Sequence, residues 1–358
     1  MAVLSHRATG PWYTTRRAIR GKIVMASSGR ANAREESPAK NLRFGIVGVG
    51  VMGSNHARVL AELPGIELVA IADPDTEHAK RIANAAGCAT VTDHKSLLAL
   101  GLDAVVVAAP THLHHQVALD CIETGVHLLV EKPIAPTVAE GREIVAAARR
   151  KGVKLMVGHV ERFNPTVQAI KQAISDQEIL SIGITRVGPF PPRMSNVGVV
   201  IDLAVHDIDL IRWFTESEIT EVQPQLTRAI AQREDIALLQ FRTASGVLAH
   251  INTNWLTPFK ARTVHVATRN KYVIGDLLTR QVTECYGFQP DGSYSMRHLS
   301  VGHAEPLRAE LLHFIQSIRG DEKPLIGGEE GVASLEIAIQ CLEGNSAIPK
   351  RGPRAVAS

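Results

Sequence analysis

The chain has 358 residues, enough for about two domains at roughly 150 residues each. Apolar residues make up 45% and charged residues 21%, which excludes collagen-like and largely disordered classes. The formal net charge is +3, but the positive excess lies in residues 1–40 and 349–358, and the body between them is acidic. The overall basicity therefore indicates no nucleic-acid partner.

Four cysteines are scattered along the chain without a C-x-x-C pair, a pattern typical of a reducing compartment. The sequence has no apolar run of about 18 residues, so we expect a cytoplasmic protein without a membrane-spanning helix. Residues 1–34 are rich in arginine and lack Asp and Glu, as organellar transit peptides do. We favour disordered ends at 1–40 and 349–358, or a true start at Met25.

A glycine-rich loop follows the first strand pattern, at residues 42–48. Gly48, Gly50 and Gly53 form a G-x-G-x-x-G that opens a helix pattern. In this setting the glycines allow a tight turn, a close approach to a pyrophosphate, and packing of the helix on the strand. The sequence therefore predicts a dinucleotide site, and the alternative is a turn that binds no cofactor.

A second strand pattern at 66–72 ends in Asp73, 20 residues beyond Gly53. A carboxylate at this position accepts hydrogen bonds from the adenosine ribose and repels a 2′-phosphate. Asp73 therefore favours NAD over NADP.

Helix and strand patterns continue to alternate through the first half. We expect helices at 54–63, 76–86, 95–100, 114–124 and 138–151, and strands at 104–108, 127–130 and 154–157. Unbroken apolar strands between helices predict a parallel sheet that is covered on both faces. Such a sheet binds ligands beyond the carboxyl ends of its strands.

Two loops at those ends carry polar side chains. Residues 109–115 hold three histidines but no cysteine or acid, which disfavours a metal site. A cofactor-lining loop is the better interpretation, with a solvated helix start as the alternative. Lys132 directly follows a buried strand, where it is either a snorkelling surface residue or a cation of the site. Its position favours the site, and Pro133 is a candidate for a cis bond.

The second half reads as consecutive strands. After a helix at 166–174 we expect strands at 180–187, 221–229, 236–243, 247–255 and 263–268, and a ribbon beyond Lys271. Strands without helices between them predict an antiparallel sheet. A helix at 199–214 can cover one face, and we expect the other face to bury against a second subunit in a homo-oligomer, a dimer or tetramer. Helices are also expected at 305–318 and 331–342.

Asp202, His206 and Asp209 lie at positions i, i+4 and i+7 of the 199–214 helix, on one face. Histidine exchanges protons near neutral pH, and a carboxylate beside it can orient its ring. The flanking apolar residues and the family resemblance given next favour a catalytic role for Asp202 and His206, whereas a hydrogen-bonded structural network is a real alternative for Asp209.

Together these residues resemble the glucose–fructose oxidoreductase/inositol dehydrogenase (Gfo/Idh/MocA) family. The resemblance runs from about Leu42 to Glu343 and is carried by the glycine-rich loop with Asp73, the Pro110–His114 loop, Glu131-Lys132-Pro133, and the Asp-x-x-x-His of Asp202 and His206. One departure is Ala204, where many members have glycine.

The resemblance implies an α/β Rossmann domain, a doubly wound parallel sheet, at 41–163. It also implies an α+β domain with a large, mainly antiparallel, open-faced sheet at 164–348. Expected cofactor contacts are Gly48, Gly50, Val51, Met52, Gly53, Asp73, Ala109, Pro110, Thr111, His114, Glu131 and Lys132.

The expected reaction is NAD-dependent oxidation of a secondary hydroxyl without a metal. His206 acts as general base, Lys132 stabilises the developing alkoxide, and Asp202 orients one or both.

Residues 158–165 resemble the family's segment that joins the two domains, and residues 186–193 and 197–209 resemble members that oxidise UDP-N-acetylglucosamine at its 3-hydroxyl. The product would be a 3-keto sugar nucleotide, which an aminotransferase uses in the resembled lipid A pathway. Expected substrate contacts are Arg162, Asn164, Arg186, Arg193 and Asp209, with the arginines on the two phosphates. Surface positions are the alternative for each arginine. The alternative functions are oxidation of inositol or another free sugar, and a non-catalytic NAD-binding regulator.

Overall fold

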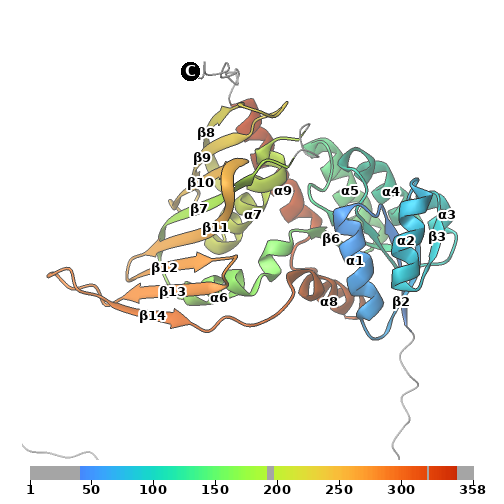
Figure 1. Ribbon diagram of the computed structural model, residues 1–358, viewed down its shortest axis with the longest axis horizontal. Helices are drawn as coiled ribbons and strands as arrows, with labels where there is room; N and C mark the ends of the chain where they lie inside the picture. Colours follow the sequence, from blue (N-terminus) through green and yellow to red (C-terminus); the bar gives the residue numbers. More distant parts are fainter. Residues whose placement is uncertain (1–40, 192–196, 321, 345–358) are drawn as a thin grey trace, which may run out of the picture. The chain divides into compact units, whose positions relative to one another are not determined.

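The computed structural model describes residues 41–191, 197–320 and 322–344. The expected extension at 1–40, the tail at 349–358 and Arg193 lie outside the described residues. Two sheets dominate the fold, and each has its own hydrophobic core (Figure 1).

The first sheet has six parallel strands in the order β3-β2-β1-β4-β5-β6. The strands are β1 (Leu42–Val47), β2 (Ile66–Ala72), β3 (Ala89–Val91), β4 (Ala104–Val107), β5 (His127–Glu131) and β6 (Leu155–Gly158). This order is that of the Rossmann fold. β4 is buried at all four positions because helices cover both faces, which explains its unbroken apolar run. The sequence analysis missed β3, which has only three residues.

Local signals set the helices around this sheet. They are α1 (Val51–Glu62), α2 (Thr76–Ala86), α3 (His94–Leu98), α4 (His114–Glu123) and α5 (Val138–Lys151), with 3₁₀ turns η1 (Thr111–Leu113) and η2 (Val160–Phe163). Asp75 caps α2 by accepting from the His78 N–H at 3.0 Å. Thr137 and Glu140 form a reciprocal capping box that begins α5.

The second sheet has eight strands in the order β14-β13-β12-β11-β7-β10-β9-β8. They are β7 (Ile179–Pro189), β8 (Ile219–Thr227), β9 (Ile236–Thr243), β10 (Leu248–Asn254), β11 (Leu256–Thr268), β12 (Lys271–Asp276), β13 (Gln281–Tyr286) and β14 (Ser295–Leu299). The sheet is antiparallel as expected, apart from the parallel pair β7 and β10. That pair arises because a helical crossover follows β7 and leads to the far edge, from which β9 and β10 return by hairpins.

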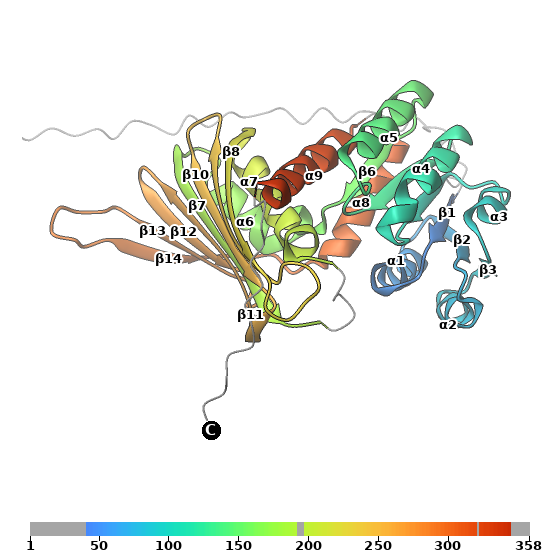
Figure 2. The same ribbon diagram turned by 90° about the horizontal axis from the view of Figure 1, so that it is seen from above.

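The remaining helical segments are α6 (Pro165–Ala173), η4 (Val200–Ala204), α7 (Val205–Thr215), α8 (Pro306–Arg319) and α9 (Gly328–Glu343). Figure 2 shows α6, α7 and α9 on one face of the eight-stranded sheet. α8 instead joins the core of the first sheet through Leu307, Leu311 and Phe314. None of the described helices is long and apolar enough to cross a membrane.

The helix expected at 199–214 is present, but its first turn is not α-helical. η4 is a π-helical turn, in which the Val205 N–H reaches the Val200 carbonyl five residues back. Two contacts anchor the start of this turn: the Val199 N–H donates to the Glu234 carbonyl at 3.0 Å, and the Val200 N–H donates to the Glu234 carboxylate at 3.2 Å. A residue distant in sequence therefore anchors the start of this turn.

The opposite face of the eight-stranded sheet is covered by none of the described helices (Figure 2). Side chains along β9 alternate between buried and exposed, as a sheet with one covered face requires. Leu238 and Leu248 on this outer face are 49% and 50% exposed.

Candidate active site

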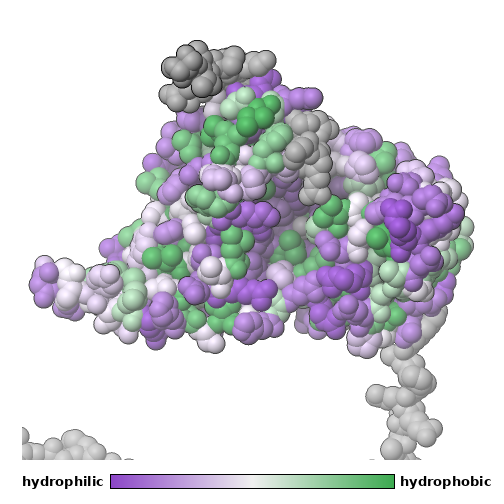
Figure 3. Space-filling view, in the orientation of Figure 1, coloured by the Kyte–Doolittle hydropathy of each residue, from purple (hydrophilic) through white to green (hydrophobic). Residues whose placement is uncertain are grey.

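A cavity of about 570 Å³ lies where the carboxyl ends of the parallel strands meet η4 and α7. Figure 3 shows the molecular surface hollowed between the parts built on the two sheets (Figure 3). The cavity is lined by Val51, Met52, Ala108, Ala109, Thr111, His114, Glu131, Lys132, Gly158, Val160, Glu161, Arg186, Asp202, Leu203, His206 and Arg262.

The glycine-rich loop has the geometry that a bound pyrophosphate requires. Gly48 adopts a φ of 86°, and a Cβ there would lie 2.6 Å from the Ala109 backbone. A Cβ on Gly53 would lie 1.9 Å from the Gly48 carbonyl oxygen, so only glycine lets α1 start here. A Cβ on Gly50 would meet open space, and Gly50 supplies no side-chain cap to α1. The N-terminus of α1 is therefore accessible to an anion.

Asp73 stands beside this loop at the end of β2. Its Oδ2 accepts from the Val49 N–H at 2.8 Å and its Oδ1 from the Asp75 N–H at 2.9 Å. Each carboxylate oxygen keeps a further lone pair for a ribose hydroxyl. The residues present thus fit a bound dinucleotide.

The three histidines of the 109–115 loop take separate places. The His114 ring nitrogens lie 2.8 Å from the Ala109 carbonyl and 2.9 Å from the Pro133 carbonyl. His115 contacts Glu143 at 2.8 Å, and His112 is exposed. Among the described residues no cluster of His, Cys, Asp or Glu is suited to hold a metal ion.

His114 ties its own loop to the Lys132–Pro133 peptide bond, which is cis. The candidate cis bond proposed from the sequence is confirmed.

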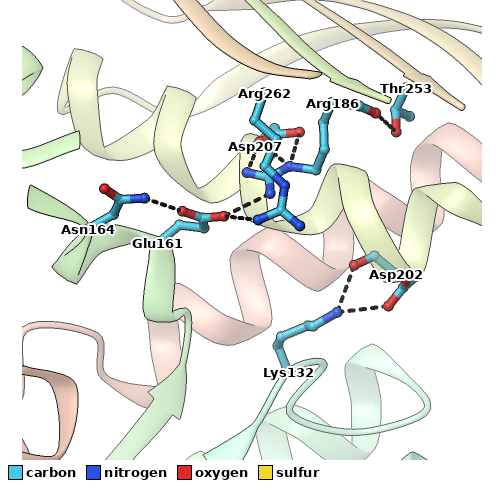
Figure 4. Close-up of polar contacts among 8 residues, drawn as sticks. All are labelled: Lys132, Glu161, Asn164, Arg186, Asp202, Asp207, Thr253 and Arg262. Carbon is cyan, nitrogen blue, oxygen red and sulfur yellow. Dashed lines mark hydrogen bonds and ion pairs between the residues drawn. The ribbon is translucent and has the colours of Figure 1, made fainter. Parts of the chain in front are cut away.

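Lys132 reaches from the end of β5 to η4. Its Nζ donates to the Asp202 carbonyl oxygen at 2.7 Å and to Asp202 Oδ1 at 3.2 Å (Figure 4). Both side chains are mostly buried, at 15% and 23% exposure. An ammonium has three N–H donors, so a third remains for a ligand in the cavity.

His206 lines the same cavity, one turn beyond Asp202. Its ring packs edge-on against His159 with centroids 6.1 Å apart, and its Nδ1 is buried without a hydrogen-bond partner among the described residues. Burial lowers the pKa of His206 well below its ordinary 6.5, and the charges of Lys132 and Arg186 lower it further. The ring is therefore neutral at physiological pH and can accept a proton.

Glu131 is a buried carboxylate beneath the cavity floor. It contacts His56 Nε2 at 2.7 Å, and its Oε2 would lie 3.0 Å from a Cβ on Gly158. Burial opposes ionisation of Glu131, but His56 and Lys132 outweigh that effect and hold its pKa below the ordinary value.

Arg186 is held in a buried network of carboxylates. Its Nε and Nη2 donate to Asp207 at 2.8–3.0 Å, and its Nη1 donates to Glu161 at 2.7 Å (Figure 4). The side chain lines the cavity but is only 4% exposed. Burial penalises its charge, yet the two carboxylates raise the pKa of Arg186 above its ordinary value.

Arg162 and Asp209, both expected to touch substrate, lie instead in a buried ion pair. Arg162 donates from Nε and Nη2 to the two Asp209 oxygens, each at 2.7 Å, and neither residue is among those that line the cavity. Burial opposes ionisation of Asp209, but His159 and Arg162 lower its pKa. The structural alternative considered for Asp209 therefore matches this arrangement.

Asn164 caps α6: its Oδ1 accepts from the Thr166 N–H at 3.0 Å, and its Nδ2 donates to Glu161 at 3.1 Å. Arg193 lies outside the described residues. Of the five expected substrate contacts, only Arg186 is a described cavity residue.

The structure also brings in residues that the sequence analysis did not select. They are Ala108, Gly158, Val160, Glu161, Leu203 and Arg262. Glu161 could have been selected from the sequence, because it lies in the segment 158–165, next to the expected Arg162. Arg262 carried no local signal, because it is one of many charged residues in the strand patterns of the second half.

Two family models match the chain. "Oxidoreductase family, NAD-binding Rossmann fold" matches residues 42–159, and "GFO/IDH/MocA C-terminal domain" matches residues 168–274.

Two curated relatives differ in how much of the chain they align with. The chain is 28% identical over 306 residues to UDP-N-acetylglucosamine 3-dehydrogenase of Acidithiobacillus ferrooxidans, an alignment that covers 84% of this chain and 96% of that protein. It is 35% identical over 227 residues to inositol 2-dehydrogenase of Rubrobacter xylanophilus, covering 60% of this chain and 65% of that protein. The chain thus spans under two thirds of the second relative.

A solved structure of the Acidithiobacillus ferrooxidans UDP-N-acetylglucosamine 3-dehydrogenase superposes with a TM-score of 0.79. It is 26% identical, and the superposition covers 84% of this chain and 96% of that one.

We predict that Arg162→Met destabilises the protein by about 3–5 kcal/mol, because it leaves Asp209 buried without its partner. Urea unfolding measures the change. The double variant Arg162→Met/Asp209→Leu should recover most of the loss, since it removes the orphaned charge. A substrate-binding Arg162 would give the opposite result: unchanged stability and a raised KM.

Proposed function

The chain belongs to the GFO/IDH/MocA oxidoreductase family, and from this membership and its cavity we propose that it is an NAD-dependent dehydrogenase of a sugar secondary hydroxyl. The observation that carries the proposal is that Lys132, Asp202 and His206 line the same cavity, with the Lys132 ammonium bound to Asp202. A non-catalytic NAD-binding regulator would need no such set of proton-handling groups.

The cofactor would lie along the glycine-rich loop, with its pyrophosphate at the start of α1 and its adenosine ribose on Asp73. When bound, NAD supplies the hydride acceptor. Ala109, Pro110, Thr111, His114 and Glu131 would line the rest of its path toward Lys132. We propose NAD rather than NADP because Asp73 would repel a 2′-phosphate.

The substrate hydroxyl would sit between Lys132 and His206. Neutral His206 takes the hydroxyl proton, and the remaining donor of Lys132 stabilises the oxygen as negative charge develops. Asp202 holds the ammonium in place and offsets its charge. A lowered pKa makes His206 a weaker base, and the Lys132 charge compensates by making the hydroxyl easier to deprotonate.

We further propose UDP-N-acetylglucosamine as the substrate, oxidised at its 3-hydroxyl to a 3-keto sugar nucleotide. The support is that the Acidithiobacillus ferrooxidans relative aligns over nearly its whole length, across both domains. Inositol is the second candidate, supported by the higher identity over the shorter alignment with inositol 2-dehydrogenase. Both use the same hydroxyl chemistry, so Lys132, Asp202 and His206 do not discriminate between them.

The open face of the eight-stranded sheet supports a homo-oligomer, in which the outer face packs against a second copy. Leu238 and Leu248 would be buried there. All four cysteines are free thiols, which supports placing the protein in a reducing cytoplasm.

For the activity, we expect purified protein to form NADH with UDP-N-acetylglucosamine, and more slowly or not at all with inositol or with NADP. Lys132→Met and His206→Asn should each lower kcat by about 10²–10⁴-fold while NAD affinity stays nearly unchanged, because both act on the hydroxyl. Initial rates and NAD titration by fluorescence measure the two effects. Undiminished turnover in both variants would refute the assignment.

For the pH dependence, we expect the acidic limb of kcat/KM to have its midpoint below 6.5. The folded-state pKa of His206 is lowered by burial and by Lys132, Arg186, His159 and Arg262, so the base stays neutral at pH 6.5 and activity falls only as pH drops through that lower value. The residual activity of His206→Asn should lack this limb. A midpoint at or above 6.5 would contradict the assignment.

For the assembly, light scattering at micromolar concentration should give a mass at least twice that of one chain. Leu238→Arg/Leu248→Arg places two charges on the outer face and should shift the protein toward monomer. Leu100→Arg, at an exposed leucine remote from that sheet, serves as control. A monomeric wild type would rule out the oligomer.

A further inference from the structure

Arg262 is the cavity arginine whose donors are least used among the described residues. It lies on β11 with 38% of its side chain exposed, and its ion-pair contact is Nη1 to Glu161 Oε1 at 3.5 Å. That carboxylate already accepts from Arg186 at 2.7 Å and from Asn164 at 3.1 Å. A guanidinium has five N–H donors, so most of those on Arg262 remain for a ligand.

The strand register places Arg262 beside a second positive charge, so the unliganded position is electrostatically unfavourable. Arg262 on β11 pairs directly with Arg186 on the antiparallel neighbour β7. Like charges at directly opposed positions repel. Arg186 is compensated by Asp207 and Glu161, whereas among the described residues Arg262 has the single long contact to Glu161. The positive charge of Arg262 is therefore incompletely neutralised.

The electrostatics of the group agree with this picture. Burial lowers the pKa of Arg262 below its ordinary value, and the neighbouring Arg186 lowers it further. A bound anion beside Arg262 would oppose both effects, because its negative charge stabilises the charged guanidinium and its oxygens accept hydrogen bonds from it. Figure 4 shows Arg262 beside Arg186 and Glu161, apart from the Lys132–Asp202 pair (Figure 4).

We propose that Arg262 binds an anionic group of the sugar substrate and thereby selects charged sugars over neutral ones. The inference rests on the proposed dehydrogenase function and names the substrate class of that same cavity. The ligand chemistry is an anionic oxygen group on a sugar ring, carried either as a phosphate ester at C1 or as a carboxylate at C6.

The position of Arg262 suits such a group. It lines the same cavity as Asp202 and His206 and lies within electrostatic range of both. A phosphate on C1 of a pyranose is two ring carbons from the 3-hydroxyl. One ring held between His206 and Arg262 would therefore present its hydroxyl to the base and its anion to the guanidinium.

The test compares Arg262→Gln, which removes the charge, with Arg262→Lys, which keeps it. Arg269→Gln is the matched control: it lies on the surface beyond β11 and removes one exposed ion pair with Glu178. Calorimetry measures binding of UDP-N-acetylglucosamine, N-acetylglucosamine 1-phosphate, glucuronate and neutral N-acetylglucosamine to each full-length protein. Initial rates then separate KM from kcat for every sugar that is oxidised.

Arg262→Gln should weaken binding of an anionic sugar by about 10- to 100-fold, with a matching rise in KM and little change in kcat. Neutral N-acetylglucosamine should change less than about 3-fold, Arg262→Lys should recover part of the loss, and Arg269→Gln should behave as wild type. If Arg262→Gln binds both phosphate esters more weakly, the group that Arg262 binds is a phosphate at C1. If only glucuronate binds more weakly, the group is a carboxylate.

Equal weakening of anionic and neutral sugars, or no change in any of them, would overturn the proposal. So would a wild type that binds none of the anionic sugars at millimolar concentration. If no sugar yields NADH, the proposed function fails, but the binding comparison still reports on Arg262. Thermal unfolding of unliganded Arg262→Gln should occur at or slightly above the wild-type temperature, since Glu161 keeps Arg186 and Asn164 as partners and the repulsion between the two arginines is removed.

Discussion

The contact between Lys132 and Asp202 joins the two sheets of this protein at one point. Lys132 follows the carboxyl end of β5, and Asp202 lies in the π-helical turn that leads into α7 over the second sheet. Because the ammonium binds both the main-chain carbonyl and the carboxylate of Asp202, it positions the turn as well as the side chain. The glycine-rich loop and His206 thereby face the same cavity.

A second layer of buried charge supports that junction. Arg186 is satisfied by Asp207 and Glu161, and Arg162 by Asp209. Burying these ions is costly, and each pair is stable only while both partners are present. The guanidinium groups of Arg162 and Arg186 are therefore paired with carboxylates of the fold. Among the described cavity residues, Arg262 is the partly exposed guanidinium.

Most elements could be predicted from the sequence because their causes are local. The helix at 76–86 has Asp75 as its cap and a left-handed Gly87 at its end, and the structure begins and ends it where expected. The strand expected at 236–243 has the same bounds in the structure. The π-helical turn and the parallel pair β7 and β10 could not be predicted, since they depend on Glu234 and on strand order, which are distant in sequence.

The sequence by itself determined the parallel sheet and the glycine-rich loop with Asp73, because periodicity, turn chemistry and strand ends are local properties. Its resemblance to family motifs singled out Lys132, Asp202 and His206. Only the tertiary structure decided which arginines face the cavity. Their carboxylate partners lie 21, 47 and 101 positions away, for Arg186 with Asp207, Arg162 with Asp209 and Arg262 with Glu161. Whether an arginine is satisfied by the fold or left for a ligand depends on such distant partners, and no local pattern records them.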